Sequence, residues 1–146
     1  IQTPPLPAGR WEFRIAYTAN SKRGVAQMFL DGKPCGIPLD MRMESKHANI
    51  GWVADADTQD NGVENDKMMR NRGYMKGPST VLMKSTSQPL RQNVQSLRRI
   101  VTTEEFQQAG PHLLRIKSVE DNTKAEFHLD FLEFVPSSYL ENEGRD

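Results

Sequence analysis

Residues 10–19 read RWEFRIAYTA, and this stretch decides the fold. Large apolar side chains occupy every second position, and charged or small side chains lie between them. This period of two is typical of a β-strand with one buried face, because successive side chains point to opposite sides of a sheet. The apolar set is Trp11, Phe13, Ile15 and Tyr17, and the opposite set is Glu12, Arg14 and Ala16.

A hairpin is predicted next along the chain. GVAQMFL, residues 24–30, ends at Asp31-Gly32, a dipeptide that favours tight turns because both residues tolerate positive φ. KPCGIPLDMR, residues 33–42, then continues as a strand that contains Pro34 and Pro38. Proline lacks the backbone N–H that a central strand donates, so this strand is expected at a sheet edge.

The second half of the chain predicts more strands. LRRIVTT (97–103), HLLRIKSVE (112–120) and AEFHLDFLEFV (125–135) alternate or are rich in β-branched residues. In the last of these we expect a buried face, formed by Phe127, Leu129 and Phe131. Two weaker signals are a short strand at 50–53 (IGWV) and one helical turn at 103–106.

Short strands separated by turns, without a sustained helical period, predict an all-β fold, an antiparallel β-sandwich. The expected organisation is a Pro-rich entry or linker at 1–9, a β-sandwich domain at 10–136 and a polar tail at 137–146. One long irregular loop insertion, 54–96, interrupts the sandwich. Loops of this length in compact domains are usually functional or poorly ordered, although residues 65–75 could form one or two helical turns.

Composition narrows the function classes. Lys and Arg together number 19, as do Asp and Glu, so the chain has no net positive charge to attract nucleic acid. No apolar run approaches the about 20 residues that span a bilayer, so direct membrane insertion is not expected. The single cysteine, Cys35, permits no internal disulfide and is best interpreted as a buried, inert thiol. Common catalytic signatures are absent, which favours a binding module over an enzyme.

Two aromatic residues lie outside the strand pattern, Trp52 at the start of the insertion and Tyr74 within it. A flat ring in a loop can stack on a sugar, while nearby polar groups fix the orientation of the ligand. Arg72, Asp66 and Asn71 are the candidate polar contacts. In the alternative interpretation, Trp52 fills a core edge and Tyr74 anchors its own loop, because large aromatic side chains are mostly buried.

An acidic run in the same insertion suggests a possible calcium site. Asp55, Asp57 and Asp60 supply oxygen ligands of the kind that calcium prefers. The spacing does not fit an EF-hand loop, because Gly62 and Glu64 fall at the eighth and tenth positions from Asp55 rather than the sixth and twelfth. A solvated acidic loop is the alternative.

Four short motifs resemble those of galactose-binding-like jelly rolls, the fold of family 6 and family 35 carbohydrate-binding modules. The resemblance implies a jelly-roll fold, and it transfers no calcium site, because the calcium segment expected before the first matched strand is missing or reduced to residues 1–7. The matching motifs are Ala8-Gly9-Arg10-Trp11, Leu30-Asp31-Gly32, Gly110-Pro111-His112-Leu113-Leu114 and Asp130-Phe131-Leu132-Glu133-Phe134.

A closer resemblance joins NSKRGVAQMFLDGKPCGIPLDMR, residues 20–42, with ENDKMMRNRGYMKGP, residues 64–78. Both look like the C-terminal β-sandwich domain of exported lipoproteins from gut bacteria, some of which carry fasciclin-type domains and are associated with glycan acquisition. The resemblance implies an extracellular or cell-surface location, attached through a parent protein, and a glycan ligand.

The sequence thus suggests two functions of different classes. The first is a non-catalytic carbohydrate-binding module of a bacterial cell-surface protein, with a glycan or oligosaccharide as its partner. The second is a structural or protein-interaction domain of a surface lipoprotein, which docks neighbouring domains of the parent protein and does not bind glycan.

Overall fold

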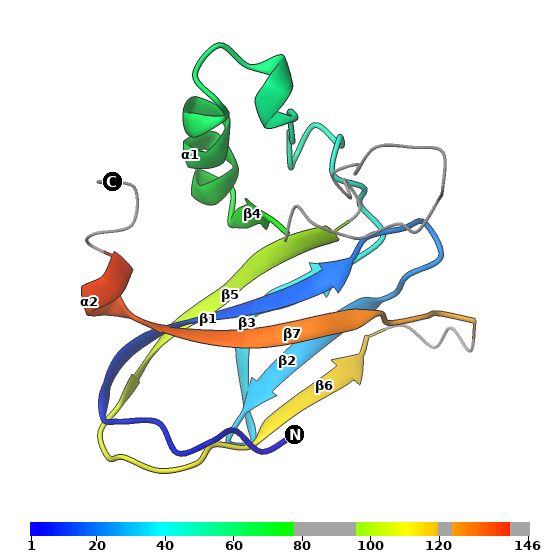
Figure 1. Ribbon diagram of the computed structural model, residues 1–146. Coiled ribbons are helices and arrows are strands. Elements are labelled where there is room, and N and C mark those ends of the chain that lie inside the picture. The colour runs from blue at the N-terminus through cyan, green and yellow to red at the C-terminus, as the bar shows by residue number, and fades with distance from the viewer. Residues whose placement is uncertain (78–95, 120–123, 141–146) are drawn as a thin grey trace, which may run out of the picture.

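The computed structural model describes residues 1–77, 96–119 and 124–140 (Figure 1). The first part of the chain contains β1 (Gly9–Thr18), β2 (Val25–Leu30), β3 (Lys33–Asp40), η1 (Asp55–Asp57), α1 (Val63–Asn71) and β4 (Tyr74–Lys76). The later parts contain β5 (Ser96–Phe106), β6 (Leu114–Ser118), β7 (Leu129–Pro136) and α2 (Ser137–Leu140).

These strands form two sheets in which all the pairings between strands are antiparallel. One sheet has the order β4-β5-β1-β7 and the other has the order β3-β2-β6. The prediction of a mostly β, antiparallel fold is confirmed. Strand β1, which begins the argument from sequence, lies inside its sheet and pairs with both β5 and β7.

The hairpin of β2 and β3 is as predicted. Asp31 has φ 50° and Gly32 has φ 80°, so the tight turn uses the positive-φ conformation that this dipeptide tolerates. Strand β3 lies at the edge of its sheet, as predicted. A strand in this position has only one neighbour, so the missing N–H groups of Pro34 and Pro38 are tolerated there.

Both sheets contribute side chains to one hydrophobic core. From β1, Phe13, Ile15 and Tyr17 are at most 1% exposed, as the alternation predicts. Cys35 is buried, and burial raises the pKa of its thiol to about 11, which keeps it protonated and unreactive at neutral pH. Other buried members include Ala26, Met28, Leu30, Leu39, Met41, Ile50, Leu97 and Leu114.

Three local predictions are wrong. Residues 50–53 form no strand. Residues 103–106 form no helical turn, because β5 continues through Phe106, whose partner on β1 is Gly9.

The third wrong prediction concerns β7, where the predicted alternation is out of phase. Leu132 and Phe134 pair with Ile15 and Phe13 and pack against the core, whereas Phe131 does not. The register of β7 shifts between its pairs with Ile15 and Tyr17, and such a bulge reverses the side-chain alternation. Of the other rings expected in the core, Trp11 and Phe127 pack against it only partly buried.

The insertion is more regular than expected, because residues 54–77 include η1, α1 and β4. Figure 1 shows α1 standing above the four-stranded sheet, next to β4. Residues 78–95 of the insertion, residues 120–123 and residues 141–146 of the tail lie outside the described residues. Within the described parts, no helix is long and apolar enough to cross a membrane.

The Pro-rich entry runs against the segment between β5 and β6. Gln2 forms an isolated bridge with Leu113, and Leu6 forms one with Gly110. The entry is therefore pinned to the folded body by backbone hydrogen bonds.

Candidate functional site

Both aromatic residues predicted to stack on a ligand are buried. Trp52 is 5% exposed and Tyr74 is 6% exposed, and both belong to the hydrophobic core. The Arg99 guanidinium lies 4.4 Å from the centre of the Tyr74 ring, which gives that ring a cation–π partner within the protein. Neither ring has a free face for a sugar, so the stacking assignment is wrong, and the alternative of core and anchor roles fits the structure.

The predicted polar contacts also serve the fold. Asp66 binds the ammonium group of Lys76 at 3.0 Å, and Arg72 donates to the carbonyl oxygens of Ala48 and Ile50. Asn71 is exposed at the end of α1. No hydrogen bond or ion pair between described residues joins any two of the five predicted site residues. The structure therefore does not assemble them into one site.

Two members of the acidic run of the insertion, Asp55 and Asp60, have partners within the chain. Lys76 Nζ lies 2.5 Å from Asp55 Oδ1 and reaches Asp66 from the same position. Asp60 accepts hydrogen bonds from the amides of Gly62 and Glu64 at the start of α1, and these bonds lower the pKa of its carboxyl group. In the described segments, no group of three or more His, Cys, Asp or Glu side chains is placed to hold a metal ion. At Asp55, the only one of the three aspartates in the run that an ion pair joins to Lys76 in the described residues, a lysine ammonium thus supplies the positive charge.

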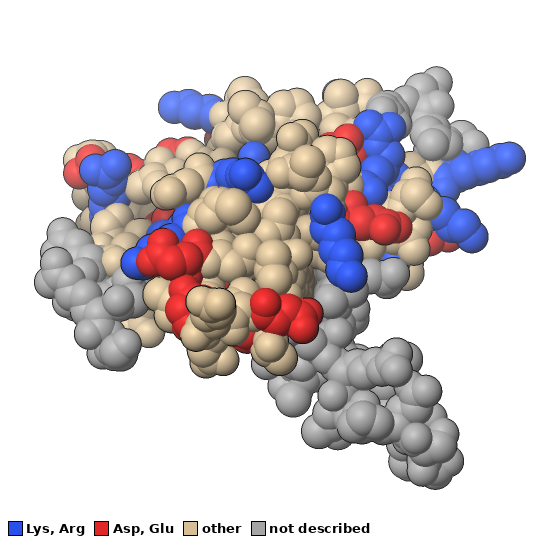
Figure 2. All heavy atoms as spheres, turned by 90° about the horizontal axis from the view of Figure 1, so that it is seen from above, with Lys and Arg blue, Asp and Glu red and all other residues tan. Residues whose placement is uncertain are grey.

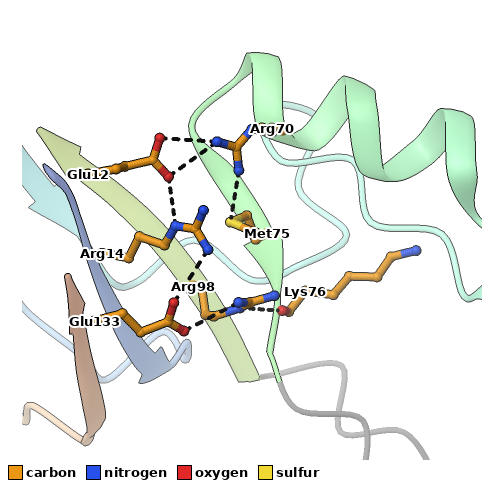
Figure 3. A network of polar contacts seen from close by, with 7 residues as sticks. All are labelled: Glu12, Arg14, Arg70, Met75, Lys76, Arg98 and Glu133. Atoms are coloured by element: carbon orange, nitrogen blue, oxygen red, sulfur yellow. Dashed lines mark hydrogen bonds and ion pairs between the residues drawn. The ribbon is translucent and has the colours of Figure 1, made fainter. Parts of the chain in front are cut away.

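A buried charge network lies beneath α1 (Figure 3). Arg14, 1% exposed, donates to Glu12 at 2.6 Å and reaches Glu133 at 3.4 Å. Arg70 of α1 contacts the same Glu12 carboxylate at 3.1 Å, and Arg98 contacts Glu133 at 3.3 Å. Glu12 and Arg14 alternate with the core face of β1, so the sequence predicts these two side chains to face solvent. Both are buried instead, beneath the insertion, whose position the strand pattern cannot reveal.

An open pocket lies near one end of the sheets, between the β1–β2 turn and the loop that follows β3. Its volume is about 440 Å³, and it is lined by Ser21, Arg42, Met43, Glu44, Lys46 and His47. Sequence reasoning missed this pocket. The only local signal was a run of mixed charges, MRMESKH at 41–47, directly after an edge strand.

The loop at 41–53, which we call the pocket loop, is held by its own backbone. The amide of His47 donates to the carbonyl of Glu44, the amides of Ile50 and Gly51 donate to the carbonyl of His47, and the amide of Trp52 donates to the carbonyl of Ser45. These bonds fold the pocket loop into consecutive turns. At its two ends the chain enters the core, through buried Met41 at one end and buried Ile50 and Trp52 at the other. Trp52 is therefore an anchor of the pocket loop.

Side chains of the pocket are oriented by neighbours. Asp40 receives hydrogen bonds from Arg42 Nε at 2.8 Å and Nη2 at 2.9 Å, a fork that fixes the guanidinium plane and lowers the pKa of the Asp40 carboxyl. His47 Nδ1 accepts a hydrogen bond from the amide of Asn49, so in the neutral ring the proton is on Nε2. The pocket thus offers donors from Arg42, Lys46 and His47 and an acceptor from Glu44.

Surface charge on the α1 side of the molecule is mixed in sign. In Figure 2, which looks down on the molecule from the side of α1 in Figure 1, cationic and anionic side chains are interspersed. The formal net charge of the chain is zero. A net charge of zero gives the chain no overall positive field for the long-range attraction of a polyanion.

Comparison with known proteins identifies no relative. No family model matches the chain, and no curated protein or solved structure matches it significantly.

Proposed function

We propose that this chain is a non-catalytic carbohydrate-binding module and that it binds its glycan in the pocket lined by the β1–β2 turn and the pocket loop. The observation that carries the proposal is the pocket itself. It is open, about 440 Å³ in volume, and lined by polar and charged side chains around one methionine, which present mostly their apolar atoms to it. Sugar hydroxyls both donate and accept hydrogen bonds, and the pocket supplies both kinds of partner.

The fold supports the same proposal. Two antiparallel sheets that share one core are compatible with a jelly-roll β-sandwich of the galactose-binding-like type. The pocket lies in loops at a sheet end, where binding residues are commonly displayed on a rigid scaffold. The resemblance to surface lipoproteins of gut bacteria adds a location, the cell surface, where the module would hold glycan for its parent protein.

Substituting pocket residues tests the proposal. The purified domain is screened on a glycan array with calcium and with a chelator, and any ligand found is titrated against Lys46→Ala and His47→Ala. Both side chains are exposed, so the variants are expected to fold. Because hydrogen bonds from charged or ring donors are lost, we expect each variant to raise the dissociation constant about tenfold.

Lys33→Ala is the matched control. Lys33 is an exposed lysine at the opposite end of β3, roughly 20 Å from the pocket by strand length, and its removal should leave affinity unchanged. A blank array would count against glycan binding. Binding that survives both pocket variants would place the ligand elsewhere on the molecule.

A second candidate function is a structural or protein-interaction domain. It is favoured by exposed apolar side chains around the three-stranded sheet, where Ile37 of β3 is 67% exposed and Val119, just after β6, is 53% exposed. Exposed apolar groups mark a protein contact where they lie together in one contiguous patch. A blank array combined with a neighbouring domain of the parent protein that shields Ile37 would support this candidate.

A further inference from the structure

The pocket loop is also held from outside, by helix α1. The side-chain amide of Asn65 donates to the carbonyl of Gly51 at 2.8 Å, and its oxygen accepts from the amide of Val53 at 3.0 Å. One side chain thus satisfies two backbone groups, on either side of the anchor Trp52. The loop is irregular at this point, and without these bonds both groups would need other partners.

Arg72 holds the same loop two turns further along the helix. Its Nη1 donates to the carbonyl of Ala48 at 3.0 Å and reaches that of Ile50 at 3.4 Å. Gly51 has φ 74°, and a Cβ at this position would lie 2.6 Å from Arg72 Nη1. The positive φ favours glycine at this position, and the close guanidinium group shows how tightly Arg72 passes the loop.

We propose that Asn65 and Arg72 are positioning residues for the pocket, and that α1 sets the shape of the pocket loop through them. We call these two side chains the clamp. The proposal rests on the proposed function for its effect on binding, but the positioning itself concerns the loop alone. Lys46 and His47 line the pocket and lie directly before Ala48 in the chain. Because Arg72 binds the carbonyl of Ala48, the clamp restrains the backbone next to these two pocket residues. The packing of α1 against the pocket loop and the order of that loop are therefore coupled.

Hydrogen exchange in the free protein tests the clamp without any ligand. The double variant Asn65→Asp/Arg72→Met keeps the size of both side chains and removes the donors to the loop. Three lost hydrogen bonds, one from Asn65 and two from Arg72, are expected to speed exchange in residues 44–53 roughly tenfold or more. Amides of β2 and β6 should exchange as in the unchanged protein, because the sheets retain their contacts.

Lys67→Met is the matched control on the same helix, because Lys67 pairs with Glu64 on the solvent side and is 65% exposed. It should leave exchange in 44–53 unchanged, and Arg72→Lys, which retains one cationic donor, should restore part of the protection lost in Arg72→Met. Unchanged exchange of 44–53 in the double variant would overturn the proposal, as would equal acceleration over the whole chain.

A second readout separates the clamp from the proposed function. If the array yields a glycan, the double variant should weaken its binding about tenfold through faster dissociation, since a loosened loop must be reordered on binding. Faster loop exchange with unchanged affinity would overturn the effect of the two side chains on binding, while leaving glycan binding and their hold on the loop intact. A blank array would remove the proposed function, and the exchange result would still decide whether α1 holds the loop.

Discussion

At the scale of single residues, the charges of this protein fall into two classes that the sequence does not distinguish. Arg14 and Arg42 both pair with a carboxylate close by in the sequence. The side chain of Arg14 is 2% exposed and that of Arg42 is 44% exposed. Removing one partner of a buried pair leaves the other charge buried and uncompensated, whereas an exposed pair is largely replaced by water.

Arg14→Met is therefore expected to destabilise the protein by about 3 kcal/mol or more, because Glu12 and Glu133 lose a buried partner. Arg42→Met, the matched control, should cost about 1 kcal/mol or less. Urea unfolding followed by circular dichroism measures both. Equal losses would mean that the network beneath α1 is hydrated in solution.

At the scale of elements, the two sheets approach closely where β3 passes β5. Gly36 has φ 64°, and a Cβ there would collide with the carbonyl oxygen of Val101. Gly32 also has positive φ, but nothing lies within 4 Å of its Cβ position. Both glycines have a positive φ, but only Gly36 has a backbone atom of a neighbouring strand at its Cβ position.

Gly32→Ala is expected to cost about 1 kcal/mol from the left-handed conformation alone. Gly36→Ala should cost at least about 1 kcal/mol more, because a backbone atom of β5 has to move. Thermal or urea unfolding of the two variants gives the difference. If the losses were the same, β3 and β5 would be further apart in solution than described.

Strands with a clear alternation of side chains were predictable from sequence, whereas features that depend on pairing with a distant strand were not. β1 was predictable because one face of it meets the core along its whole length, so Phe13, Ile15 and Tyr17 alternate without interruption. The phase of β7 was not, because its bulge appears only once β7 is paired with β1. Pairing with β1 also explains why the predicted turn at 103–106 is a strand, since local propensity yields to cross-strand hydrogen bonds.

The candidate site was less predictable than the strands. An isolated aromatic in polar sequence can face a ligand or the core, and burial of Trp52 and Tyr74 depends on where the insertion folds. The pocket joins Ser21 to the loop after β3, a contact that no local pattern contains. Trp52 and Arg72, which the sequence suggested as ligand contacts, instead help to hold the pocket loop.

At the scale of the whole molecule, the two sheets and the insertion are held by different forces. The sheets share an apolar core, whereas α1 buries only Met69 completely and is held largely by polar contacts. Lys76 is central to these contacts, because its ammonium joins Asp55 of η1 to Asp66 of α1. Burial of little apolar surface implies a low free energy of local opening.

Lys76→Met is accordingly expected to open residues 55–71 as a unit, because two carboxylates lose their shared cation while the sheet core is untouched. Native-state hydrogen exchange should show amides of α1 exchanging through a low-energy opening, with those of β1 and β2 exchanging only on global unfolding. Lys67→Met, which removes an exposed lysine from the same helix, should leave both classes unchanged. If Lys76→Met accelerated amide exchange in β1 and β2 as much as in α1, the insertion would unfold together with the sheets as one cooperative unit. The proposal that polar contacts hold the insertion separately from the apolar core would then be wrong.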